Sequence, residues 1–371
     1  GKYGIGGFTS EAKKFVRLLK YAGQKYWQIL PMNPTGFKDS PYQSYASFAI
    51  NPYFIDLDQL KRNHYLSEDE IKNHTKTRNT GKIDYGYLYE NRFILLELAS
   101  KRAMRREKNK IDKFYKQSKF WVEDYALFLT LKKLYNNVPW TDFPEALRKH
   151  QKKALEQVKN DNFELFYSFV TIQYFAFSQY KKIKKYANKM GVSIIGDVPI
   201  YVSYDSSDVW ANQKEFLLDK DGHPTLVAGV PPDYFSATGQ LWGNPIYDYA
   251  HMEKNHFKWW LRRIKHACKL YDYIRVDHFR GFASYYVINP EEGTALNGEW
   301  LEGPRNKIID VFNKVANGRI IAEDLGILTD DVFELMDYAK YPGLVIFEFA
   351  NFLDTSHKYL PNNYKENSVA Y

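Results

Sequence analysis

Three short apolar segments of this chain, 192–199, 271–278 and 319–324, each carry an acidic residue at or near their end. Helical patterns lie before the first segment (163–190), between the second and third (306–316) and after the third (330–339). Because alternating strands and helices are typical of parallel sheets built from βα units, we expect an α/β fold. Segments 26–30 and 344–350 fit as two further strands, and 367–371 fits as the start of a sixth.

In each of the three segments the acid shares a strand face with the residue two positions before it, because side chains alternate along a strand. These pairs are Ile195 with Asp197, Arg275 with Asp277, and Ile321 with Glu323. An inward charge is tolerated when it is paired, so Arg275 and Asp277 could form a buried ion pair that only fixes the strand. Three inward acids serve no purpose in a core, however, whereas the carboxyl end of a parallel barrel is where catalytic groups gather.

Enzymes that cleave glycosidic bonds use two carboxylates, one on either side of the bond. One acts as nucleophile or base and the other as proton donor. Arg275 beside Asp277 favours the ionised carboxylate, which suits a nucleophile. Glu323 follows three apolar residues, and partial burial there is expected to raise its pKa, which suits a general acid.

Composition excludes several classes of protein. With 371 residues, 44% hydrophobic and 17% aromatic, the chain can build a core, so disorder is a poor interpretation. No segment reaches the roughly 18 to 20 apolar residues of a membrane span, and the single Cys268 rules out an internal disulfide and predicts a cytoplasmic location. The net charge of +8 leaves nucleic-acid binding a weak hypothesis, because the basic run 101–119 has the spacing of a solvated helix face.

Changes in composition and in helical pattern along the chain predict three parts. Residues 1–60 are expected to form the N-terminal part of a barrel, 61–164 a helical insertion, and 165–371 the continuation of the barrel. Within the last part, residues 203–249 show little periodicity and are rich in Gly, Pro, Asp and aromatic residues. Long loops without regular structure are usually functional, so we expect an active-site lid there.

Several blocks of this sequence resemble the 4-alpha-glucanotransferases of glycoside hydrolase family 77, also called amylomaltases or disproportionating enzymes. The two strongest are 271–281 (YDYIRVDHFRG) and 320–326 (IIAEDLG). Four further blocks follow the order of that family, at 39–44 (DSPYQS), 195–200 (IGDVPI), 229–235 (GVPPDYF) and 238–245 (TGQLWGNP). The resemblance implies a (β/α)8 TIM barrel with helical insertions and no organic cofactor. The nine histidines show no metal-binding spacing, so no metal is expected either.

Carried over to this sequence, the resemblance implies that Asp277 is the nucleophile, Glu323 the acid/base and Arg275 the residue that orients Asp277. It also implies a set of residues that contact sugar, namely Asp197 in the pocket floor, Tyr42, Ser44, Asp233, Tyr234, Phe235, Trp242, Asn244 and His278. The partners implied are a maltodextrin or α-1,4-glucan donor and a glucose or maltooligosaccharide acceptor, with no nucleic acid and no membrane.

Compared with the family pattern, the first and last barrel strands and a third catalytic acid are expected to be missing, so we expect an incomplete barrel with impaired activity. Glu348 is an acid on an expected strand that we do not assign to the site. Two alternatives to glucan transfer stay open at this point: an α-glucan hydrolase that uses the same two acids, and a non-catalytic glucan-binding fragment.

Overall fold

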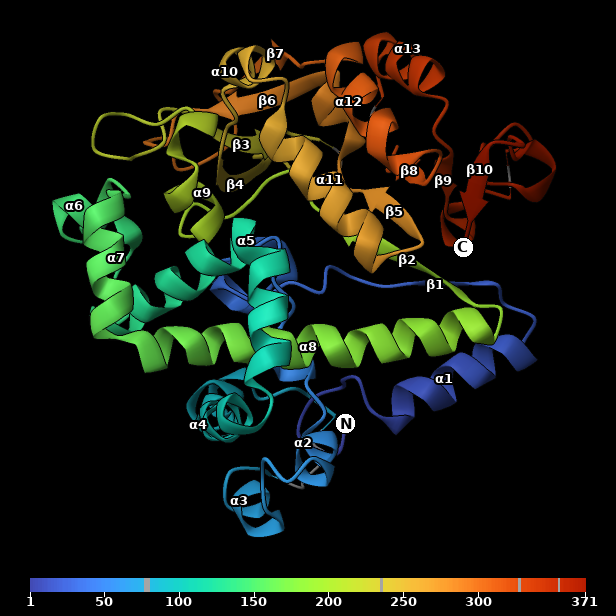
Figure 1. The fold of residues 1–371 in the computed structure, drawn as a ribbon. Coiled ribbons are helices and arrows are strands. Elements are labelled where there is room, and N and C mark those ends of the chain that lie inside the picture. Colours follow the sequence, from blue (N-terminus) through green and yellow to red (C-terminus); the bar gives the residue numbers. More distant parts are fainter. Residues whose placement is uncertain (77–80, 234–235, 326–327, 353) are drawn as a thin grey trace. The chain divides into compact units, whose positions relative to one another are not determined.

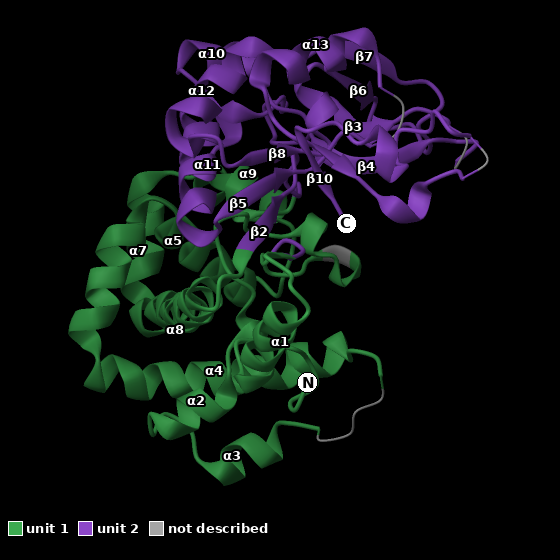
Figure 2. Ribbon diagram, turned by 90° about the vertical axis from the view of Figure 1, so that its right-hand side faces the viewer, with its two compact units in different colours: residues 1–27, 32–193, 205–211 green, residues 28–31, 194–204, 212–371 purple. Residues whose placement is uncertain are grey.

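The computed structural model describes residues 1–76, 81–233, 236–325, 328–352 and 354–371, and it divides into two compact units (Figure 2). Unit 1 comprises residues 1–27, 32–193 and 205–211. Unit 2 comprises residues 28–31, 194–204 and 212–371. No helix in the described ranges combines the length and the apolar character needed to cross a bilayer.

Unit 1 is helical. Its helices are α1 (Ser10–Tyr21), α2 (Leu57–Arg62), α3 (Glu68–Asn73), α4 (Tyr85–Arg106), α5 (Lys108–Leu134), α6 (Glu145–Arg148), α7 (Lys152–Asp161), α8 (Phe163–Lys189) and α9 (Ser207–Ala211). Helix α8 packs against α1, α4, α5 and α7 (Figure 1). Because it has neighbours on several sides, its buried residues are not confined to one stripe, and the run 166–173 is buried without interruption.

Two buried glutamines of α8 bind the segment that precedes α2, on either side of a 3-10 helix at Pro52–Phe54. The side-chain amide of Gln173 accepts a hydrogen bond from the backbone N–H of Ile50 and donates one to its carbonyl, both at 2.9 Å. Gln179 does the same with Asp56, at 2.7 and 3.3 Å. Each amide thereby satisfies one buried donor and one buried acceptor, as a neighbouring β-strand would.

Unit 2 contains the parallel strands that the sequence predicts. The central sheet has the order β1-β2-β5-β8, with β1 at Tyr26–Gln28, β2 at Ser193–Val198, β5 at Tyr273–Val276 and β8 at Ile320–Ala322. Of β1 only Gln28 is counted in this unit, and β2 enters it at Ile194. Strands β9 (Gly343–Val345) and β10 (Ser368–Ala370) pair in parallel, and the Ala322 N–H donates to the Pro342 carbonyl beside them at 2.9 Å. The helices of this unit are α10 (Tyr249–Lys254), α11 (Lys258–Leu270), α12 (Asn306–Ala316) and α13 (Asp330–Ala339).

One face of the parallel strands forms an apolar layer below the acids. Ile195, Ile321 and Leu344 pack together there, with Tyr273 and Val369 against them. Each of Ile195, Tyr273 and Ile321 lies two positions before a charged residue. The predicted alternation along these three strands is therefore confirmed, because the charged residues continue the face that the apolar layer occupies.

The prediction of a long irregular loop over 203–249 is wrong in part. Strands β3 (Val227–Val230) and β4 (Gln240–Pro245) lie in this stretch, and with β6 (Ser284–Ile288) and β7 (Glu299–Glu302) they form an antiparallel sheet of order β4-β3-β6-β7. A Cβ on Gly229 would lie 2.4 Å from the Gln240 carbonyl oxygen. The glycine that looked like a loop residue is thus required for close approach of two strands.

The prediction of a strand over 344–350 is also wrong beyond its first residues. Strand β9 ends at Val345, and a 3-10 helix covers Phe347–Phe349. Both phenylalanines of that helix are exposed, and so is Glu348. The alternation of apolar and acidic residues that suggested a strand lies instead on an exposed turn of helix.

Candidate active site

Acidic residues stand at the carboxyl ends of three adjacent parallel strands. Asp197 on β2 is in register with Arg275 on β5, and Arg275 is in register with Ile321 on β8. The pairing continues past the strand ends, because the Asp277 N–H donates to the Val198 carbonyl and the Glu323 N–H to the Val276 carbonyl, each at 3.0 Å. The sheet itself therefore brings together the acids that the sequence predicted for the site.

One guanidinium nitrogen joins two of these acids. Arg275 Nη1 lies 2.7 Å from Oδ1 of Asp197 and 2.8 Å from Oδ1 of Asp277. The Asp197 side chain is 3% exposed and the Asp277 side chain 27% exposed. Asp197 is thus a buried counter-ion that holds Arg275 in place, whereas Asp277 is the more exposed acid of the pair.

The pKa values of Asp277 and Glu323 are both raised, but by partly different causes. Burial raises the pKa of Asp277, and the charge and hydrogen bond of Arg275 oppose this shift without cancelling it. Burial also raises the pKa of Glu323 to about 7, and the neighbouring Asp277 charge adds to the shift. Arg275 therefore acts on Asp277 in the direction expected from the sequence, but burial is the larger effect, and Glu323 shifts as expected.

Backbone donors fix the orientation of Glu323. Its Oε2 accepts a hydrogen bond from the His278 N–H and its Oε1 accepts one from the Leu325 N–H, each at 2.8 Å. His278 has a φ of +51°, in the left-handed region, where few residues other than glycine lie. Strained backbone is typical of functional sites, and here it occurs at the residue that follows Asp277 and donates to Glu323.

The side chain of His278 contacts Trp242. The two rings meet edge to face with centroids 4.9 Å apart. Burial lowers the pKa of His278 to about 3, so the imidazole is neutral at ordinary pH. Trp242 Nε1 in turn donates to Gln240 on the same strand at 3.1 Å. The structure thus brings two of the residues expected to contact sugar together, beside the acid that His278 orients.

Other predicted residues of unit 2 make local contacts. Asn244 is buried and its Nδ2 donates to the Val202 carbonyl at 2.8 Å, so its amide holds a loop. Asp233 Oδ1 accepts from the Ser236 N–H at 2.8 Å. Tyr234 and Phe235 lie outside the described residues.

The remaining two predicted residues, Tyr42 and Ser44, lie in unit 1. Ser40 caps the turn that carries Tyr42, accepting from its N–H at 3.2 Å. Ser44 is buried, and its hydroxyl both accepts from the Ala46 N–H and donates to the Ala46 carbonyl, at 3.1 and 3.2 Å. The Ser44 hydroxyl therefore has a structural role in shaping this loop.

Asp208 fixes the same loop and was missed by the sequence reasoning. This buried carboxylate accepts two hydrogen bonds from Ser47, one from its N–H and one from its hydroxyl, both at 2.7 Å. Ser207 adds a bond from its N–H to the Tyr45 carbonyl at 2.9 Å. The only signal in the sequence is the polar run Ser206-Ser207-Asp208 before the apolar Val209 and Trp210, which is common at helix starts and does not identify the partner.

Tyr371 is a second residue that the sequence reasoning did not place in the site. Burial is the main cause of its raised pKa, and the charges of Arg275, Glu323 and Asp197 all act on it. Its N–H donates to the Val345 carbonyl at 3.0 Å, so the pairing of β10 with β9 positions it. The phenol thus lies close enough to the three strand-end groups for their charges to act on it.

Parallel βα units that carry two acids and an arginine at their carboxyl ends are typical of α/β enzymes of the barrel type, which gather catalytic groups at that edge. The sequence model of a family described as 4-alpha-glucanotransferase matches residues 1–371. The chain belongs to this 4-alpha-glucanotransferase family.

Individual relatives agree with this assignment. A 4-alpha-glucanotransferase of Clostridium butyricum is 44% identical over 373 residues, covering 100% of this chain and 77% of its own length. The Thermus thermophilus protein of the same name is 41% identical, covering 98% of this chain and 73% of its own. A chloroplastic/amyloplastic 4-alpha-glucanotransferase of Solanum tuberosum is 39% identical, covering 100% of this chain and 66% of its own length.

Solved structures confirm the fold class. Amylomaltase from Streptococcus agalactiae in complex with acarbose superposes with a TM-score of 0.95 at 38% identity, covering 100% of this chain and 76% of that one. Amylomaltase from Corynebacterium glutamicum has the same fold, with a TM-score of 0.78 at 17% identity, covering 99% and 51%. The predicted α/β barrel is thus confirmed, and the matches favour 4-alpha-glucan transfer over the hydrolase alternative.

Proposed function

We propose that this protein moves α-1,4-glucan segments from a maltodextrin donor to the 4-hydroxyl of a glucose or maltooligosaccharide acceptor, by a retaining double displacement. Asp277 is the nucleophile, Glu323 the acid/base and Arg275 the residue that orients Asp277. The observation that carries this proposal is the pair of strand-end acids, one held by Arg275 and the other with a pKa raised to about 7.

In the first step, the Asp277 carboxylate attacks the anomeric carbon of the donor while Glu323 gives its proton to the departing glycosidic oxygen. One carbon–oxygen bond forms and one breaks, and the shortened glucan leaves with a hydroxyl group. A carboxyl with a pKa of about 7 still carries a proton at neutral pH in about half of the molecules, and is a better donor than an ordinary glutamate. The Arg275 contact keeps the attacking oxygen in place.

In the second step, Glu323 is a carboxylate and takes the proton from the 4-hydroxyl of the acceptor, which displaces Asp277 from the anomeric carbon. Two inversions at that carbon give net retention. Transfer in place of hydrolysis requires that an acceptor sugar exclude water. The apolar edge contact between Trp242 and His278 beside the acid provides a water-poor surface against which such a sugar can pack.

Product sizes test this proposal. Pure maltotriose incubated with the protein should give glucose together with oligosaccharides longer than three units, because only transfer lengthens a chain. Glucose and maltose alone would show hydrolysis and overturn the proposal. The chain covers 77% of the length of the Clostridium butyricum relative. The same assay on a version extended to that length separates a wrong assignment, in which both chains fail, from a need for the added residues.

A further inference from the structure

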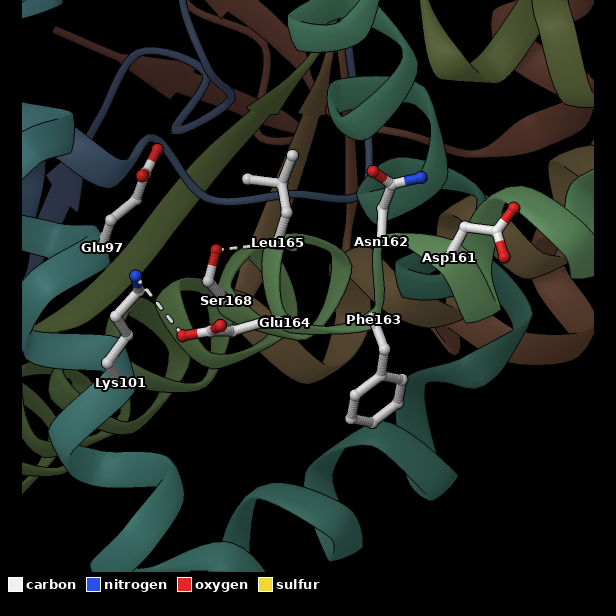
Figure 3. Close-up of a pocket in the computed structure, with 8 residues that line it drawn as sticks. All are labelled: Glu97, Lys101, Asp161, Asn162, Phe163, Glu164, Leu165 and Ser168. Atoms are coloured by element: carbon white, nitrogen blue, oxygen red, sulfur yellow. Dashed lines mark hydrogen bonds and ion pairs between the residues drawn. The ribbon is translucent and has the colours of Figure 1, made fainter.

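A hollow of about 260 Å³ opens in unit 1 where α7 gives way to α8 (Figure 3). Its walls come from α4 and from this junction, and its lining residues are Glu97, Lys101, Asp161, Asn162, Phe163, Glu164, Leu165 and Ser168. Its volume is several times that of a water molecule, about 30 Å³, and slightly below the range of about 300–1,000 Å³ for sites that bind small organic ligands.

Phe163 presents an aromatic face at this hollow. Its side chain is 51% exposed, although it is the first residue of a long buried helix. Its ring stacks on Tyr167 with centroids 5.3 Å apart and an angle of 17° between planes. Tyr167 is itself held by a hydrogen bond to Asp112. Tyr167 thus supports the ring, Phe166 contacts it with centroids 6.5 Å apart, and about half of the side chain stays exposed to a flat partner.

The polar groups around the ring are nearly balanced in charge. Lys101 reaches from α4 towards Glu164, at 3.3 Å (Figure 3). Glu97 is paired with Lys133 at 2.6 Å. The lining itself therefore holds three carboxylates, counting Asp161, and one ammonium group, and Lys133 from outside the hollow neutralises a second carboxylate. Such a lining offers many donors and acceptors without a strong field of either sign, so it fits a neutral ligand with several hydroxyl groups better than an anion.

The start of α8 supplies further donors. The Asn162 side chain does not cap the helix and donates instead to the Val158 carbonyl at 3.0 Å. The first amides of a helix have no partner within it, so those of Phe163 and Glu164 can serve hydroxyl oxygens. A pyranose ring has this combination of surfaces, with apolar C–H groups on its faces and hydroxyl groups at its rim.

We propose that this hollow is a second binding site for α-glucan chains, in which Phe163 stacks on a glucose ring and the polar rim binds its hydroxyls. The inference rests on the proposed function, because it takes the same class of polymer. Glycogen presents many glucose rings at once, so it is the ligand on which the loss of such a site is measured.

Glycogen binding tests the proposal, measured by retardation in native gels that contain the polymer. All variants carry Asp277→Asn so that the polymer is not consumed. Phe163→Ala should weaken glycogen binding by between about twofold and tenfold, the range for one aromatic contact, and Phe163→Trp should retain it. The matched control is Phe333→Ala, which removes a phenylalanine that is 46% exposed on α13 in the other unit and should bind as the parent does.

Three results would overturn the inference: equal binding by the Phe163→Ala variant, equal losses in the Phe163→Ala and Phe333→Ala variants, or binding that disappears when salt is raised from 0.05 to 0.5 M. The last result would indicate a charged contact, because a neutral ligand is insensitive to screening. Melting temperatures of all variants check folding. The maltotriose assay on the protein with Asp277 intact does not depend on this hollow. It therefore separates failure of the proposed function from failure of this inference.

Discussion

Nη1 of Arg275 lies 2.8 Å from Oδ1 of Asp277, and the same nitrogen lies 2.7 Å from Asp197. Because Asp197 is almost fully buried, removal of the guanidinium leaves its charge without this partner. Arg275→Ala should therefore cost about 3–5 kcal/mol in the free energy of unfolding, the range for breaking a buried ion pair. Urea denaturation measures the loss, and a loss below about 1 kcal/mol would contradict this account of the ion pair.

A second prediction concerns the pH dependence of activity. Glu323 must be protonated to act as the acid, so kcat/KM should fall as pH rises through about 7, its raised pKa. Asp277 must be ionised, and because burial raises its pKa, the acid limb should lie above the pH at which an ordinary aspartate titrates. A maltotriose pH profile checks both limbs, and a rate constant that keeps rising to pH 9 would exclude Glu323 as the proton donor.

The same shift predicts a pH dependence of stability. A carboxyl whose folded pKa is raised stabilises the fold fully below its unfolded pKa, and the stabilisation is lost as pH rises through the folded value. The native protein should therefore lose stability between about pH 4.5 and pH 7 in a way that Glu323→Gln abolishes. Urea midpoints at pH 5 and pH 8 measure this difference. Glu348→Gln, at an exposed acid, is the matched control and should behave as the native protein does.

A third site for mutation is Asp208, which anchors the loop containing Tyr42 and Ser44. Asp208→Ala removes two hydrogen bonds to a buried carboxylate and should cost about 1.5–3 kcal/mol or more in unfolding free energy. If Tyr42 contacts sugar, KM for maltotriose should rise by a larger factor than kcat falls. The control is Asp142→Ala, at an exposed acid of the same unit. An unchanged KM in a folded Asp208→Ala variant would show that this loop does not bind the substrate.

The parallel strands of unit 2 could be predicted because their signal is local. Strands β2, β5 and β8 lie within the apolar segments that end in acids, and helix α12 has the predicted bounds. A run of apolar residues that ends in a polar one predicts a buried strand from the local sequence alone. The convergence of Asp197, Arg275 and Asp277 followed because adjacent parallel strands end at the same edge of a sheet.

Other features could not be predicted because they depend on partners distant in the sequence. Strand β3 pairs with the nearby β4 and also with β6, nearly sixty positions later, although its own sequence looked like a loop. Asp208 acquires its role from Ser47, which lies 161 residues earlier. Tyr371 comes close to the three strand-end groups only through the pairing of β10 with β9. In each case the contact, and not the local pattern, determines what the residue does.

The nucleophile is tested most directly by trapping the covalent intermediate. A slow fluorinated maltosyl donor, incubated with the Glu323→Gln variant and followed by protease digestion and mass spectrometry, should add one maltosyl unit to the peptide that contains Asp277. The Asp277→Asn variant should show no label. A label on Asp197 or elsewhere, or a native protein that lengthens maltotriose while Asp277→Asn retains full turnover, would contradict the assignment of Asp277 as the nucleophile.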